Sequence, residues 1–251
     1  MRFFITLILL SISFSSFSNE ETMNNDGDKY ILLNYSTFGI KYNCTKRGFD
    51  YFMYNTIPDS GDNPRVEPFY QEQRLPEECR QFTTNTYKTP MGIQKFDRGH
   101  GVHQNIWDHD PEIMKQTNVF SNIVPHSRYL NQHGLWRHLE KVTECFRDTN
   151  DLHVVGGNIW GNDASNDYFL KSHGVVTPDY LFKIIVINDK DVFAFKIPNT
   201  DEPTYYNGTN YLTTVSQIES DLGYSLPSIK DELKNIKERY VPRTPKSCSI
   251  K

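Results

Sequence analysis

The sequence is poor in cysteine and has no excess of positive charge. Its 251 residues include four cysteines, which lie far apart and form no C-x-x-C pair, so their spacing does not indicate a zinc or redox motif. The formal net charge is −4 at pH 7. That balance argues against a protein that holds nucleic acid by bulk positive charge, although a local basic groove is compatible with it.

Long hydrophobic runs are also missing, except at the start of the chain. Arg2 precedes the apolar run Phe3–Phe14, and Ser16-Phe17-Ser18 fits the small-residue pattern of a cleavage site. We therefore expect residues 1–18 to be an export signal. The run is too short to span a bilayer, which takes about 20 apolar residues, and no later stretch is long enough. The mature protein should be soluble, secreted or periplasmic, and without membrane contact.

An exported protein enters an oxidising compartment, where cysteines commonly pair. We expect two disulfides among Cys44, Cys79, Cys145 and Cys248, and the sequence leaves all three possible connectivities open. The chain has no low-complexity linker, internal repeat or block of charge. Residues 19–251 therefore fit a single domain of the α/β (α+β) class better than two domains.

Several segments are rich in β-branched and aromatic side chains, which favour strands. The segments that predict the central sheet are 49–54, 152–155, 181–187 and 192–195. The run 119–124 predicts a further strand, which should end at Pro125. We expect these strands to build a central mixed or antiparallel sheet with helices packed against it.

Apolar side chains recur every three or four residues in other segments, which predicts amphipathic helices. One such helix covers about 130–146, with Leu135 and Leu139 on its apolar face. Two more are predicted over 214–222 and over 226–236, the last closing with Tyr240. A short helix should begin at Asp110-Pro111, because proline suits the first helical position.

Chemistry-bearing residues follow one another in three short motifs. Asp97-Arg98-Gly99-His100 comes first, Ser121-Asn122 with Pro125 follows, and Asn131-Gln132, Trp136 and Glu140 complete the series. The motifs supply a histidine, a carboxamide and a carboxylate, without a cysteine or a second histidine placed as a metal cage. A neutral imidazole can take a proton from water at physiological pH, and oxygen ligands suit one weakly held divalent ion. This inventory predicts attack of water on a phosphodiester.

In their order and spacing these motifs resemble those of the DNA/RNA non-specific endonucleases, over about residues 50–225. The resemblance implies a finger of two strands and a helix, the ββα-metal finger, laid against the sheet. It implies a secreted endonuclease that cuts both DNA and RNA and leaves 5′ phosphate. It also implies Mg²⁺ as the cofactor, with Mn²⁺ as an alternative. The sequence is compatible with a homodimer and identifies no inhibitor protein.

The resemblance also assigns roles to individual residues. It implies that His100 is the general base, that Arg98 offsets phosphate charge, and that Asn122 belongs to the site. Asn131 would be the sole direct protein ligand to the metal ion, and Glu140 would orient water around that ion. A helix N-cap is the competing role for Asn131.

A second arginine is expected upstream of these motifs, where the family stabilises the transition state. Arg65 is the assignment, with Arg74 and Arg80 as competitors, because loop lengths in this part of the chain vary. Two further positions depart from the family pattern. His126 stands where glutamine is usual, and Glu144 falls where some members carry a basic residue.

The spacing between Asn131 and Glu140 is the main departure, because Trp136 and Glu140 are each one residue further along than in the family pattern N-x-x-x-W-x-x-x-E. At 3.6 residues per turn, this extra step places Asn131 and Glu140 on roughly opposite sides of a regular helix. A π-bulge near His133-Gly134 would absorb the extra residue. Gln132 could instead supply the amide oxygen, and we favour Asn131 with a bulge.

Two rival functions are compatible with the sequence. The displaced Glu140 and the acidic balance fit a non-catalytic descendant that binds nucleic acid or an extracellular partner. The same finger could also serve a phosphodiesterase or a toxin-like effector with a narrower substrate. Salt-sensitive binding without turnover would identify the first rival, and a comparison of DNA, RNA and small phosphodiesters would identify the second.

Overall fold

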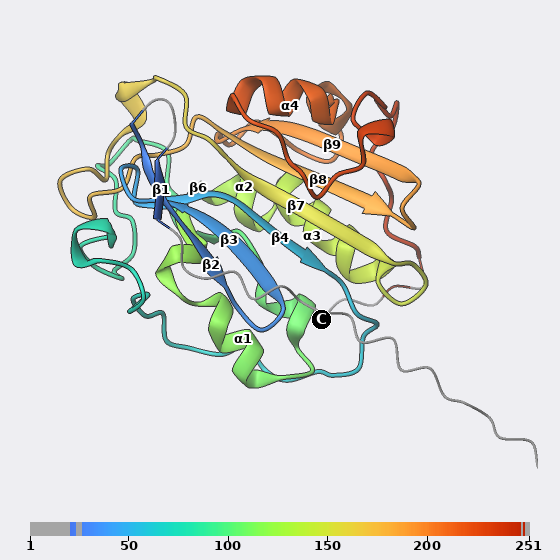
Figure 1. Ribbon diagram of the computed structural model, residues 1–251, viewed down its shortest axis with the longest axis horizontal. Coiled ribbons are helices and arrows are strands. Elements are labelled where there is room, and N and C mark those ends of the chain that lie inside the picture. Colours follow the sequence, from blue (N-terminus) through green and yellow to red (C-terminus); the bar gives the residue numbers. More distant parts are fainter. Residues whose placement is uncertain (1–20, 24–26, 247, 249–251) are drawn as a thin grey trace, which may run out of the picture.

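A long antiparallel sheet forms the centre of the molecule in the computed structural model (Figure 1), which describes residues 21–23, 27–246 and 248. The predicted export signal lies outside these residues. The sheet has eight strands in the order β1-β2-β3-β4-β7-β8-β9-β10, and every neighbouring pair is antiparallel. The strands are β1 Glu21–Met23, β2 Lys29–Asn34, β3 Phe38–Asn43, β4 Gly48–Asn55, β7 Leu152–Ile159, β8 Tyr180–Ile187, β9 Asp191–Pro198 and β10 Leu212–Thr213. The four predicted sheet segments are confirmed within β4, β7, β8 and β9.

Alternation along the central strands buries side chains on both faces of the sheet. Val154, Ile185 and Phe195 belong to one core, which also contains the apolar face of helix α3 (Leu135–Phe146). Their neighbours Val155, Ile184 and Ala194 belong to a second core, which is closed by helix α4 (Val215–Leu222). Figure 1 shows α3 and α4 on opposite sides of the sheet. Strands with apolar residues at alternate positions bury those residues on a face of the sheet. Helices with apolar residues every three or four positions bury them against that face.

Three predicted helices can be compared directly with the structure. The helix expected at Asp110-Pro111 is α1 (Pro111–Thr117), and the Asp110 side chain caps it by accepting the backbone N–H of Glu112 at 2.8 Å. The helix expected over 214–222 is α4. The third predicted helix, over 226–236, is wrong, because the segment contains only the 3-10 turn Asp231–Leu233. Pro227 interrupts it, and its apolar side chains are buried one by one in the core under α4: Leu226, Ile229 and Leu233.

A separate two-stranded sheet carries the first two motifs. Strand β5 (Phe96–His100) pairs antiparallel with β6 (Ile123–Ser127), and helix α2 (Arg128–Gln132) follows directly, which gives the predicted ββα arrangement. The strand predicted over 119–124 is displaced, since residues 120–122 form a 3-10 turn and β6 continues through Pro125. Proline is tolerated there because β6 has β5 as its only partner strand in the described sheet.

The helix predicted over 130–146 is broken in two, and no π-bulge is present in it. Helix α2 ends at Gln132 and α3 begins at Leu135, with His133 and Gly134 as the junction. Both junction N–H groups donate to the carbonyl oxygen of Tyr129, at 2.8 and 2.7 Å. A Cβ atom on Gly134 would lie 2.6 Å from the carbonyl oxygen of Pro203, so only glycine fits. This break accommodates the extra residue between Asn131-Gln132 and Glu140.

Two disulfides fix the connectivity that the sequence left open. Cys44 bonds to Cys79, and Cys145 in the last turns of α3 bonds to Cys248 near the end of the chain. The described residues contain no free cysteine. The described part of the chain also has no helix with the length and apolar character needed to cross a membrane.

Candidate active site

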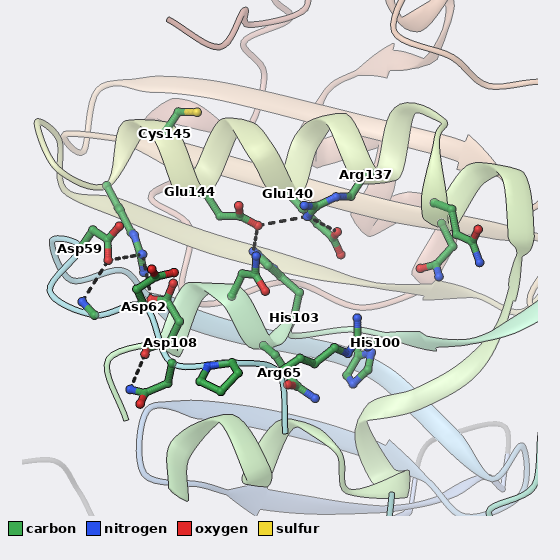
Figure 2. Close-up of a pocket in the computed structure, with 18 of the residues that line it drawn as sticks. Asp59, Asp62, Arg65, His100, His103, Asp108, Arg137, Glu140, Glu144 and Cys145 are labelled. Carbon is green, nitrogen blue, oxygen red and sulfur yellow. Dashed lines mark hydrogen bonds and ion pairs between the residues drawn. The ribbon is translucent and has the colours of Figure 1, made fainter. Parts of the chain in front are cut away.

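A cleft of about 1290 Å³ lies between strand β5, helices α2 and α3, and the loop over residues 59–69. Of the residues predicted for the site, five line this cleft and so come together in space: Arg65, Arg98, His100, Asn131 and Glu140. Figure 2 shows Glu140, with its helix neighbours Arg137 and Glu144, on one wall, and His100 and Arg65 on the other. Asn122 does not line the cleft.

His100 is fixed by a carboxamide that the sequence analysis did not single out. Its Nε2 lies 3.0 Å from Oδ1 of Asn118. Asn118 is held in one orientation, because its Nδ2 donates to the carbonyl oxygen of Val66 at 2.7 Å and its Oδ1 also accepts from Gln104. An oxygen that accepts in this way requires the proton to be on Nε2 of His100. Nδ1 is therefore the unprotonated ring nitrogen left for the cleft.

The electrostatic setting keeps this imidazole neutral. Burial lowers the pKa of His100 to about 3, and the positive charges of Arg65 and Arg98 act in the same direction. The ring also contacts Phe69, with 5.4 Å between centroids. At physiological pH the imidazole is thus free of its second proton and can accept one from water.

The arginines of this wall present their positive charge to the cleft. Arg98 stacks its guanidinium on the Phe69 ring, 3.8 Å from the centroid, and donates from Nη1 to the carbonyl oxygen of Thr84 at 3.1 Å. Arg65 is exposed at the rim. Of its two competitors, Arg74 is paired with Glu72 at 2.7 Å and Arg80 binds backbone oxygens, and neither lines the cleft.

Asp97 ties helix α2 to strand β5. Its Oδ1 accepts from Nε of Arg128 at 2.9 Å, and its Oδ2 accepts from Nδ2 of Asn131 at 3.2 Å and from Nε2 of Gln132 at 2.6 Å. Because both amide nitrogens are bound to Asp97, the amide oxygens are the atoms left for a cation. The described residues contain no group of three or more His, Cys, Asp and Glu side chains that could hold a metal ion.

The opposite wall is acidic and is organised by one arginine. Nη1 of Arg137 lies 3.3 Å from Oε2 of Glu140 and 3.1 Å from Oε1 of Glu144. Nε2 of His103 lies 3.2 Å from the same oxygen of Glu144. Burial alone would raise the pKa of Glu144, but His103 and Arg137 together lower it. A basic group therefore does stand beside position 144, supplied by Arg137 from two turns earlier.

Asn122 holds the loop that follows His100. Its Oδ1 accepts the N–H of Val102 at 2.9 Å, and its Nδ2 donates to the carbonyl oxygens of Val102 and Thr117, both at 2.8 Å. The side chain is fully buried. These contacts make Asn122 a positioning residue. Asn118, four residues earlier in the same segment, is the carboxamide that contacts His100. In the sequence, only its position as a polar residue next to Val119 and Phe120 could have pointed to it.

Trp136 and His126 lie beneath the cleft in the core. Nζ of Lys183, on β8, sits 3.9 Å from the centroid of the Trp136 ring, and His126 meets the same ring edge-on at 5.2 Å. A Cβ atom on Gly99 would lie 2.0 Å from the His126 side chain, so glycine at this position lets the histidine pack under the first motif. Trp136 is therefore a core aromatic, as its place on an amphipathic helix predicts.

Comparison with known proteins identifies a family and a similar fold. The family model for DNA/RNA non-specific endonuclease matches residues 16–232 of the chain. A similar solved structure is that of the EndoG/EndoGI complex, a study of the mechanism of EndoG inhibition, with a TM-score of 0.63 at 17% identity. The match covers 81% of this chain and 88% of that chain, and at this identity the likeness concerns the fold. No curated protein sequence matches the chain.

Proposed function

The chain belongs to the DNA/RNA non-specific endonuclease family, and we propose that it is a secreted, Mg²⁺-dependent enzyme that hydrolyses phosphodiester bonds in both DNA and RNA. One observation carries the proposal. His100, its tautomer set by Asn118, shares a cleft with Arg98, Asn131 and Glu140. The cleft thus holds a proposed base (His100), a positive side chain to bind the phosphate (Arg98), and oxygen ligands for a metal ion (Asn131 and Glu140).

The reaction begins with a water molecule beside Nδ1 of His100. The imidazole takes a proton from this water as its oxygen attacks phosphorus, in line with the bond to the 3′ oxygen. That bond breaks with its electron pair on the 3′ oxygen, which leaves and takes up a proton from solvent, and the phosphate stays on the 5′ end. Arg98 and Arg65 offset the charge that develops on the phosphate oxygens.

The donors in the cleft suit a hard divalent ion. Asn131 would supply its amide oxygen, and Glu140 would orient water around the ion, since both line the cleft and both carry oxygen donors. Such an ion, Mg²⁺ or alternatively Mn²⁺, would supply Lewis-acid polarisation of the phosphate and charge stabilisation for the leaving oxygen. The anchoring of the Asn131 nitrogen to Asp97 supports this role, because it leaves the oxygen available.

Secretion is supported by cysteine chemistry. Two disulfides are typical of proteins in an oxidising compartment, and the apolar start of the chain fits an export signal. The break between α2 and α3 supports the catalytic proposal over the non-catalytic rival, because Glu140 lines the cleft despite its displaced position in the sequence.

The direct test is cleavage of plasmid DNA and of total RNA by the disulfide-bonded mature protein, with Mg²⁺ and with EDTA. We expect both polymers to be cut only with the metal ion, and His100→Ala to lower the rate by about 10²- to 10⁴-fold. The new 5′ ends should accept labelled phosphate from a kinase only after phosphatase treatment. Binding without cutting under either Mg²⁺ or Mn²⁺ would overturn the proposal.

A further inference from the structure

A second hollow, of about 870 Å³, lies beyond the C-terminal end of α3 and is rich in aromatic side chains. Tyr206 is 94% exposed and Tyr240 is 57% exposed, which is unusual for rings of this size. Tyr206 meets Tyr205 edge to face, and Tyr240 meets Phe193 in the same way, with centroids 5.6 and 5.4 Å apart. The two tyrosines are therefore supported from one side while most of their surface stays in solvent. We call this hollow the tyrosine groove.

The tyrosine groove also carries positive charge. Arg239 and Arg243 line it and are both exposed, and the described residues offer neither of them a hydrogen bond or an ion pair. Asp191 supplies the one carboxylate among the described lining residues. Two permanently charged guanidinium groups thus stand beside two open aromatic faces.

The tyrosine groove lies next to the proposed catalytic cleft, and the wall between them is formed by the end of α3 and the C-terminal segment. Cys145 lines the cleft while Phe146 lines the groove, and Pro245 lines the cleft while Arg243 lines the groove. The wall is fastened, because Cys145 is bonded to Cys248 and the ring of His138 hydrogen-bonds the carbonyl oxygen of Pro242 at 2.8 Å. A ligand longer than the cleft can therefore extend over this wall into the groove.

We propose that the tyrosine groove binds a single-stranded stretch of the nucleic acid whose other part occupies the cleft. Unpaired bases would stack on Tyr206 and Tyr240, and Arg239 and Arg243 would bind phosphates. A base-paired duplex offers no free base face to such rings, and an aromatic groove for an uncharged peptide would gain nothing from two arginines. The inference rests on the proposed function, since it adds a binding site to the same substrate.

The test measures binding and cutting separately, with the full mature protein. Binding of a fluorescent single strand of about 20 nucleotides is followed in EDTA, and cutting of a strand of about four nucleotides is followed with Mg²⁺. We expect Tyr206→Ala with Tyr240→Ala to weaken binding of the long strand by at least about fivefold, and Tyr206→Phe to preserve it. Arg239→Gln with Arg243→Gln should weaken binding and lower its salt slope by about 0.7 per arginine. Cutting of the short strand should not change.

Lys237→Gln serves as the matched control, because it removes one exposed positive charge in the same segment but outside the groove. Equal binding by wild type and both groove variants would overturn the inference while leaving the nuclease intact. Groove-dependent binding by a protein that cuts neither strand would overturn the proposed function and keep the groove. A change of sedimentation coefficient in the tyrosine variant would instead assign the groove to contact between two copies of the chain, and would overturn the inference too.

Discussion

One wall of the cleft carries a neutral histidine among arginines, and the other carries two carboxylates held by one arginine. His100 and Glu144 are both buried, yet burial has different outcomes for their charge. On the wall formed by β5, burial lowers the pKa of His100, the hydrogen bond to the neutral amide of Asn118 offsets only part of this, and Arg65 and Arg98 add to the lowering. On the α3 wall the effect of burial on Glu144 is overcome by Arg137 and His103. Partners, more than depth, decide which groups stay charged.

The largest expected effect separates the two candidate amides of α2, which joins the walls. Asn131→Ala should abolish metal-dependent turnover, a loss of about 10³-fold or more, because the proposed metal oxygen is removed. Gln132→Ala is the matched control and should change turnover by about threefold or less, since it removes an exposed amide bound to the same Asp97. Metal titrations of initial cutting rates measure both, and the reverse ranking would assign the ligand to Gln132.

The orientation of His100, at the end of β5, can be tested without replacing the proposed base itself. Asn118→Ala removes the acceptor that fixes the His100 ring, so we expect kcat to fall by about ten- to a hundredfold with little change in KM. Ser36→Ala, at an exposed hydrogen bond near α1, is a control for folding of the region. Unchanged kcat in the Asn118 variant would show that the ring is held by other contacts.

The pH profile tests the neutral state of this wall. Because the folded-state pKa of His100 is about 3, the acid limb of kcat/KM should lie well below the ordinary histidine value of about 6.5. The free energy of unfolding should also depend on pH, because burial lowers the pKa values of His100 and His126 to about 3. The stability that the two neutral rings contribute is complete above about pH 6.5 and is lost as the pH falls toward 3. Initial rates and urea unfolding at matched pH values separate the two effects. An acid limb near pH 6.5 would contradict the buried, neutral base.

The smallest effect concerns the α3 wall. Arg137→Met keeps the apolar stem but removes the partner of two buried carboxylates, so the free energy of unfolding at pH 7 should fall by about 1–2 kcal/mol. The loss should shrink toward about pH 3, because Arg137 and His103 hold the pKa of Glu144 below its ordinary value and the carboxyl needs the arginine until it is protonated. Lys141→Gln, an exposed position on the same helix, is the control. Urea unfolding gives both values, and equal losses at the two pH values would contradict a charge-based role.

Local pattern predicted four of the eight described strands of the sheet, β4, β7, β8 and β9, and two of the helices, because burial on both faces selects β-branched and aromatic residues and a cap selects Asp110. It failed over 226–236, where the apolar residues have the spacing of a helix but Pro227 interrupts the segment, which forms only a 3-10 turn. It also misplaced the start of β6. In 226–236 and at the start of β6, the apolar residues are buried whichever conformation the segment takes. The spacing of apolar residues alone therefore did not distinguish the predicted conformation from the observed one.

The identities of the groups proposed for catalysis and their order along the chain are properties of the sequence itself, since the motif from Asp97 to His100 contains the proposed base and its neighbours. The tertiary structure decided which distant groups complete them. Asn118 is oriented by the backbone oxygen of Val66, 52 residues away, and the helix break at Gly134 depends on contact with Pro203. Such contacts arise only when packing brings remote segments together, because hydrogen bonds and steric limits act over a few ångströms in space, whatever the separation along the chain.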